Sequence, residues 1–157
     1  MRRQVELSPY RPGEAAALAR LFYGTVHAVC LGDYTQEQVD AWADGTVDVE
    51  AWDRSFLLHH TLVARIGGEI VGFADLDGEY LDRLYVHKDH QRQGVAAALV
   101  GALEQAAAQQ GAAKLTTHAS ITARPFFEKR GWRVVQAQQV ERKGVLLTNF
   151  VMEKALE

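Results

Sequence analysis

Cysteine is nearly absent from the sequence: Cys30 is the only one among 157 residues. A single cysteine cannot form a disulfide within the chain, so the sequence excludes the small disulfide-stapled domains of secreted proteins. A reducing, cytoplasmic setting is the simplest interpretation. Cys30 itself lies in an apolar helical pattern, which favours buried packing over a catalytic thiol.

Long apolar runs and an excess of positive charge are also missing. No segment approaches the ~20 consecutive apolar residues of a membrane helix, and no apolar run near the start resembles a signal peptide. Lysine and arginine number 17 against 20 aspartate and glutamate, which gives a formal net charge of −3. The sequence therefore predicts no nucleic-acid partner and no membrane partner, and any phosphate contact has to be local.

Metal-ligand spacing is a third absence. The six histidines include the adjacent pair His59 and His60, and the pair His87 and His90 in a polar turn. Neither pair comes with cysteine or carboxylate at a known ligand spacing. We therefore expect no metal.

What the sequence does contain is a strand, a polar turn and a helix in succession. Tyr80–Val86 is rich in strand-forming residues and ends at a charged turn. From Val95 until Gly111, apolar residues recur at intervals of three and four, the period of an α-helix. Gly94 lets a ligand approach the backbone closely, and the first amides of a helix attract phosphate. Arg92 adds a forked cation suited to phosphate oxygens.

Hydrophobic periodicity and turn residues predict one domain, residues 1–157, with seven strands. The expected strands cover 4–7, 61–66, 69–76, 80–86, 114–119, 132–139 and 146–152. Helices are expected after Glu14, from the capping box Thr35–Gln38, over 95–110 and over 122–130, with a weaker helical pattern around Trp52 and Phe56. The helix between the fourth and fifth strands favours a parallel pairing of these two.

The segment Gln91–Ala96 resembles the Q/R-x-x-G-x-G/A motif of the GNAT superfamily of acyl-CoA-dependent N-acyltransferases. The predicted order of strands and helices is also similar to the GNAT order along nearly the whole chain. This resemblance implies a mixed α/β fold with a central, mostly antiparallel sheet of about seven strands, about four helices, and a parallel pair flanking the cofactor cleft. It also implies acetyl-CoA as co-substrate, with its pyrophosphate held by loop amides and its pantetheine arm contacted by the backbone of Leu84 and Val86. The cofactor-binding residues implied are Leu84, Tyr85, Val86, Gln91, Arg92, Gln93, Gly94, Val95, Ala96, Ser120 and Phe127.

A second landmark of the family lies between residues 120 and 132. Where many relatives have asparagine the chain has Ser120, and where they have a tyrosine that protonates the leaving thiolate it has Phe127. Phenylalanine has no proton to give, but a thiolate whose pKa is near ~8.5 is a tolerable leaving group without help. Water or another hydroxyl would then supply the proton. Together with residues 145–154, this stretch resembles a bacterial subgroup typified by YafP, which leaves the acceptor open.

The resemblance implies an N-acetyltransferase in which a primary amine of a small molecule or peptide attacks acetyl-CoA directly in a ternary complex. Counting back from the phosphate motif places Glu79 and Tyr80 where relatives have a general base, and the amide near Leu84 where they stabilise the oxyanion. The acidic residues beside Gly78 are equally typical of a solvated turn. The acceptor pocket would draw on the early part of the chain: Phe22, Tyr23, His27, Tyr34, Trp42 and Trp52.

Two other classes of function remain as alternatives. Phe127 supports a non-catalytic acyl-CoA-binding module that serves regulation or partner binding. A doubly wound nucleotide-binding enzyme is disfavoured because no glycine-rich loop follows the first strand. Family analogy further suggests a homodimer through the last strands.

Overall fold

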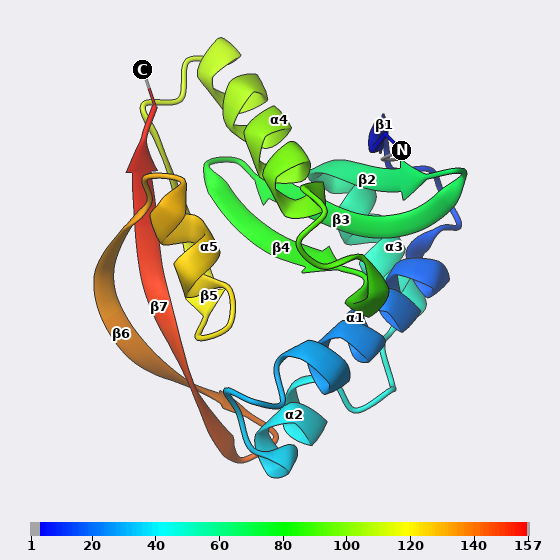
Figure 1. Ribbon diagram of the computed structural model, residues 1–157, viewed down its shortest axis with the longest axis vertical. Helices are drawn as coiled ribbons and strands as arrows, with labels where there is room; N and C mark the ends of the chain where they lie inside the picture. The colour runs from blue at the N-terminus through cyan, green and yellow to red at the C-terminus, as the bar shows by residue number, and fades with distance from the viewer. Residues whose placement is uncertain (1–3, 157) are drawn as a thin grey trace.

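The computed structural model describes residues 4–156, which form a seven-stranded mixed sheet with helices on both faces (Figure 1). The strands lie in the order β1-β2-β3-β4-β5-β7-β6, and within this described sheet only β4 and β5 are parallel neighbours. The mostly antiparallel sheet with one parallel pair is therefore confirmed. The strands span Glu6–Pro9 (β1), His60–Ile66 (β2), Glu69–Asp77 (β3), Tyr80–Val86 (β4), Lys114–Ser120 (β5), Arg133–Arg142 (β6) and Val145–Ala155 (β7).

Helices cover the two faces of the sheet unequally. They span Ala15–Val29 (α1), Gln36–Trp42 (α2), Val49–Leu58 (α3), Val95–Gln109 (α4) and Arg124–Lys129 (α5), with a 3₁₀ turn at Lys88–His90 (η1). Helix α4 lies over β2, β3 and β4, whereas α1 and α3 lie on the opposite face (Figure 1). None of the helices within residues 4–156 is long and apolar enough to cross a membrane.

The sheet separates two hydrophobic cores. Leu99 and Leu103 of α4 are fully buried in one core, and Leu18 and Val26 of α1 are fully buried in the other. The helical period of the sequence predicted these stripes because each helix buries the face that repeats every three or four residues. The capping box is also present: the Thr35 hydroxyl accepts from the Gln38 amide, and the Gln38 side chain accepts from the Thr35 amide.

Strands β1, β6 and β7 extend two or three residues beyond their predicted ends, and β3 and β5 extend by one. Strand β1 continues through Pro9 because it is an edge strand, where the missing N–H of proline leaves no ladder bond unmade. Strands β6 and β7 continue to a two-residue turn, Lys143 and Gly144, where both residues have positive φ, 51° and 78°. Such a turn matches the twist of two paired strands and lets them pair up to the turn itself. Strand β6 forms the other edge of the sheet, and the homodimer through the last strands stays a prediction.

Gly72 allows α4 to pack closely on the sheet. A Cβ at Gly72 would lie 2.8 Å from Cγ1 of Val95 and 3.1 Å from the carbonyl oxygen of Tyr85. We expect Gly72→Ala to lower the free energy of unfolding by about 1–3 kcal/mol, because a β-branched side chain and a backbone oxygen cannot both move away. Chemical denaturation would measure the loss.

The matched control is Gly24→Ala in α1, where no atom lies within 4 Å of an added Cβ. This variant should gain about 0.5–1 kcal/mol, because alanine costs less conformational entropy than glycine inside a helix. A Gly72→Ala protein as stable as the wild type would contradict the close packing of α4.

Candidate functional site

A cleft opens where β4 and β5 separate. The two strands pair only at Tyr80 with Thr116 and at Leu81 with Thr117, so their later residues are not joined by a ladder. A cavity of about 630 Å³ lies there and extends to the first turn of α4. Its lining comes from four segments: Thr25, Val29 and Cys30; Trp42; Leu84–Val86 with His90–Arg92 and Gly94–Ala97; and Ser120 with Thr122, Ala123 and Phe126.

The turn at the wide end of the cleft exposes backbone. Gly94 caps α4 in the left-handed conformation, with φ 82°, and no atom lies within 4 Å of an added Cβ. Arg92 also has positive φ, 60°, and is exposed at the cleft. The amides that begin α4 carry the positive end of the helix dipole, so this end of the cleft suits an anion.

Most predicted cofactor-binding residues line this cleft, and two do not. Gln93 is exposed beside the turn, where its side-chain oxygen lies 3.2 Å from Nδ1 of His90. Phe127 is only 2% exposed and packs against Trp132, with ring centroids 5.1 Å apart. The neighbouring Phe126 lines the cleft instead. Phe127 therefore does not line the cleft in which we expected it, because α5 directs that side chain into the core.

Two predicted roles change in detail. The side chain of Gln91 donates to the carbonyl oxygen of Val86 at 2.8 Å, and the Thr25 hydroxyl donates to the same oxygen at 2.8 Å. Gln91 thus holds the turn against the end of β4, and the Val86 carbonyl is occupied within the protein.

Cys30 is buried as expected, and burial raises the pKa of its thiol, which favours the unreactive protonated form.

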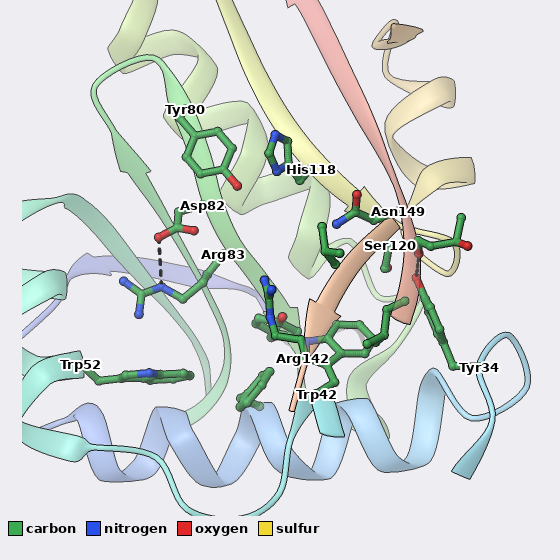
Figure 2. Close-up of a pocket in the computed structure, with 15 residues that line it drawn as sticks. Tyr34, Trp42, Trp52, Tyr80, Asp82, Arg83, His118, Ser120, Arg142 and Asn149 are labelled. Atoms are coloured by element: carbon green, nitrogen blue, oxygen red, sulfur yellow. Dashed lines mark hydrogen bonds and ion pairs between the residues drawn. The ribbon is translucent and has the colours of Figure 1, made fainter. Parts of the chain in front are cut away.

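A second, smaller cavity of about 290 Å³ adjoins the cleft (Figure 2). Trp42, Tyr85 and Ser120 line both cavities, so the two meet at these side chains. The other lining residues are Phe22, Tyr34, Trp52, Tyr80, Asp82, Arg83, His118, Val140, Arg142, Leu147, Thr148 and Asn149. Figure 2 shows them converging from the first helices, from β4 and β5, and from the hairpin of β6 and β7.

Four of the six side chains predicted for an acceptor pocket line this smaller cavity: Phe22, Tyr34, Trp42 and Trp52. Tyr23 and His27 instead stack on one another outside it, with ring centroids 4.1 Å apart, and Nε2 of His27 lies 2.6 Å from the carbonyl oxygen of Ala43. The Tyr34 hydroxyl donates to the Thr148 carbonyl at 2.6 Å and accepts from the Ile121 amide at 2.9 Å. Tyr34 therefore ties the segment before α2 to the turn after β5 and to β7 at the wall of the cavity.

A β-bulge in β4 shapes the cavity. Asp75 pairs with Arg83 and Leu76 with Leu81, so Asp82 is the extra residue on its strand. Tyr80 and Tyr85 are an odd number of residues apart and would face opposite sides of a regular strand. The bulge changes the alternation and lets both line the same cavity, together with Asp82.

The two predicted catalytic residues lie in different places. Tyr80 lines the smaller cavity, but Glu79 is exposed in the turn and lines a separate hollow with His60 and Gln110. Glu79 is therefore outside the cavity in which we expected it, because it lies in the turn before β4, where its side chain is exposed. Asp82 lies where Glu79 was expected, and no sequence signal marked the bulge that places it there.

Burial and neighbouring charges shift the pKa values of two ionisable side chains in the cavity, Asp82 and Tyr80. Burial raises the pKa of the Asp82 carboxyl, and the neighbouring charge of Asp75 raises it further, while Arg83 lowers it. Burial also raises the pKa of Tyr80, with a further rise from Asp82 and an opposing effect of Arg142. The Asp82 side chain is still 36% exposed, so it can reach a ligand or water in the cavity. A carboxylate with a raised pKa is a stronger base than one with an ordinary pKa, so Asp82 suits proton abstraction.

Asp75 anchors the bulge from beneath the cavity. It is fully buried, accepts from the Arg83 backbone amide at 2.9 Å and from Nη2 of Arg83 at 2.5 Å, and lies 2.8 Å from Nδ1 of His59. Ligand atoms of His59, Asp75 and Asp82 lie within 4.8 Å of one another, a geometry that could hold a metal. The guanidinium of Arg83 is already bound to Asp75, however, so the buried carboxylate has its cation.

Comparison with known proteins gives a consistent result. The family model described as "Acetyltransferase (GNAT) domain" matches residues 30–154. The N-acetyltransferase YafP of Escherichia coli strain K12 is 34% identical over 94% of each chain. A solved GCN5-related N-acetyltransferase from Rhodopseudomonas palustris is 37% identical, with a TM-score of 0.94 over 99% of this chain and 98% of its own. The structure of yncA from Salmonella typhimurium with its cofactor acetyl-CoA has the same fold, with 19% identity, a TM-score of 0.74, and coverage of 98% and 95% of the two chains.

Proposed function

Because this chain belongs to the GNAT family of acetyltransferases, we propose that it transfers an acetyl group from acetyl-CoA to a primary amine by direct attack in a ternary complex. One observation carries this proposal: two cavities meet at Trp42, Tyr85 and Ser120. The cleft has an anion-binding turn at one end, and the smaller cavity has a carboxylate and aromatic walls. One substrate could therefore bind in each cavity, and the two would meet at these three residues.

The cleft fits the donor. Its exposed amides and Arg92 would hold the pyrophosphate, and the open space over Gly94 leaves room for it. The protein yncA, which has the same fold, was solved with acetyl-CoA as its cofactor, and this supports acetyl-CoA as the donor. The bound thioester supplies an activated acetyl carbon, and the protein has to supply a neutral amine and a proton for the leaving sulfur.

Asp82 is the general base that the geometry favours. A lysine-like ammonium has a pKa of ~10.4, so making it neutral at pH 7 costs about 4–5 kcal/mol. Asp82 in the cavity, with its raised pKa, could take that proton, either directly or through water. Tyr80 lines the same wall and stays a candidate for the same role, and Glu79 does not.

Ser120 is the hydroxyl best placed to replace the missing tyrosine acid. Its Oγ accepts from the Ala123 amide at 3.0 Å, and its side chain lines both cavities. Its O–H proton is then free to reach the leaving sulfur. Phe127, by contrast, is buried and has no hydroxyl.

The proposal is tested by calorimetry with acetyl-CoA, run beside a thiol-release assay with a panel of amines. We expect tight binding of acetyl-CoA and release of free CoA thiol that depends on the amine. Phe127 favours the second candidate function, a non-catalytic acyl-CoA-binding module. Binding without release by any amine would support that module, and an absence of binding would rule out both.

A further inference from the structure

The smaller cavity contains an arginine whose charge the protein does not neutralise. Arg142, at the end of β6, lines this cavity together with Tyr80 and Asp82 (Figure 2). Within the described residues 4–156, its guanidinium donates a hydrogen bond to the carbonyl oxygen of its own neighbour Glu141, at 3.0 Å, and forms no ion pair. A guanidinium in this position can still bind an anion with its remaining donors.

The other arginine of the cavity is not available in the same way. Nη2 of Arg83 donates to Asp75 at 2.5 Å and to the Ser55 hydroxyl at 2.9 Å. The guanidinium carbon also lies 4.0 Å from the centre of the Phe56 ring. Arg83 is therefore satisfied by the protein, and an anion entering the cavity would meet Arg142.

A charge of the opposite sign faces the same space. Asp82 lines the cavity from the bulge of β4, and among the described residues it makes no ion pair with Arg142. Both groups act on Tyr80, because Asp82 raises the pKa of its hydroxyl and Arg142 lowers it. The two charges thus line one cavity with Tyr80 and form no ion pair with each other.

The wall between these charges is apolar and aromatic. Phe22, Trp42, Trp52 and Tyr85 form it, from three helices and β4. The volume of about 290 Å³ is near the lower end of the ~300–1,000 Å³ typical of small-molecule sites. A single small molecule fits such a space better than an extended peptide.

We propose that the acceptor is a single free amino acid, whose carboxylate pairs with Arg142 while its amine lies beside Asp82 and its apolar side chain packs on the aromatic wall. This proposal rests on the acetyltransferase function proposed above. In the reaction, the ammonium proton passes to Asp82 and on to water, and the amine nitrogen bonds to the acetyl carbon. The carbon–sulfur bond breaks, the nitrogen loses its second proton to give the amide, and the departing CoA thiolate takes up a proton to become the free thiol.

Paired acceptors test the proposal. Thiol release is measured with phenylalanine and leucine and with the carboxamide of each, which keeps the amine and side chain but removes the negative charge. We expect kcat/KM to favour the acid over its amide in the wild type. Arg142→Gln should reduce this acid-to-amide ratio by about 10- to 100-fold, the value of charge-assisted hydrogen bonds to one carboxylate. Comparing ratios between variants cancels the difference in amine reactivity.

Two variants serve as controls. Arg142→Lys keeps the positive charge but not the forked guanidinium donors, and it should keep part of the acid-to-amide ratio of kcat/KM. Arg133→Gln removes a positive charge from the same strand but outside the cavity, where Arg133 pairs with Glu153, and should keep all of it. Circular dichroism would verify that each variant is folded.

A binding measurement makes the test independent of turnover. The same acids and amides are titrated calorimetrically into protein saturated with CoA, and the acids should bind more tightly than the amides in the wild type alone. Equal binding of acids and amides, no binding of either, or an unchanged ratio in Arg142→Gln would overturn the acceptor proposal. Thiol release with amines lacking a carboxylate would in that case leave the acetyltransferase function standing, whereas failure to bind acetyl-CoA would remove the function itself.

Discussion

Replacing Gly94 with aspartate should weaken the binding of acetyl-CoA by about 100-fold or more, which corresponds to about 2.7 kcal/mol. The new carboxylate would lie at the first turn of α4, beside the amides that we expect to hold the pyrophosphate. Two like charges in one anion site repel, and the side chain also fills space that is open in the protein. Isothermal titration calorimetry measures the loss directly.

Gly94→Asn separates charge from shape in this experiment. Asparagine has nearly the same size as aspartate and tolerates positive φ better than most residues, so the φ of 82° costs both variants a similar amount. We expect Gly94→Asn to lose clearly less affinity than Gly94→Asp. Both variants should unfold at nearly the same denaturant concentration, because no neighbouring atom lies near the new Cβ. Unchanged acetyl-CoA affinity in Gly94→Asp would refute the phosphate site.

Asp82→Asn should lower kcat by about 10²- to 10⁴-fold, the usual contribution of a general base. The amide has the shape of the carboxylate but cannot accept the proton of the attacking ammonium. The nearest ion-pair contact of Asp82, 3.8 Å from Nε of Arg83, is long, so the fold should survive its loss. Steady-state thiol release at saturating acetyl-CoA gives kcat for both proteins.

The pH dependence adds a second readout for Asp82. Burial raises the pKa of its carboxyl, so the wild-type rate should fall as the pH drops through that raised pKa, where the base becomes protonated. Asp82→Asn should lack this acidic limb. Glu69→Gln, at the start of β3 and outside both cavities, controls for the loss of one negative charge and should behave as the wild type. A large loss in Glu79→Gln together with an active Asp82→Asn would restore the base expected from the sequence.

Local patterns predicted the elements of this fold well because helices and turns are encoded over short distances. The capping box at Thr35 and the apolar stripe of α4 depend on residues three and four apart, which the sequence shows directly. The strand–turn–helix segment that ends at Gly94 is of the same kind. The cleft residues that follow from this segment were therefore predictable one by one.

The smaller cavity was harder to predict because it depends on three-dimensional details that have no local signature. The bulge at Asp82 arises from the pairing of β3 with β4, and it decides that Asp82, not Glu79, faces the cavity. Phe126 and Phe127 differ by one position on a short helix, and only packing decides which of them is buried. Arg142 lies three residues beyond the predicted end of β6. The two-residue turn at Lys143 and Gly144 allows β6 and β7 to pair as far as this residue.

The two cavities draw on different parts of the chain. The donor cleft is built largely from 84–97 and 120–126, whereas most of the smaller cavity comes from the early helices and the last hairpin. If the smaller cavity binds the acceptor, as we propose, substitutions in the hairpin would alter which amine is acetylated and leave the residues of the larger cleft unchanged. The acceptor could then change during evolution through substitutions at the edge of the sheet alone. Exchanging the hairpin of β6 and β7 would be the corresponding protein-engineering experiment.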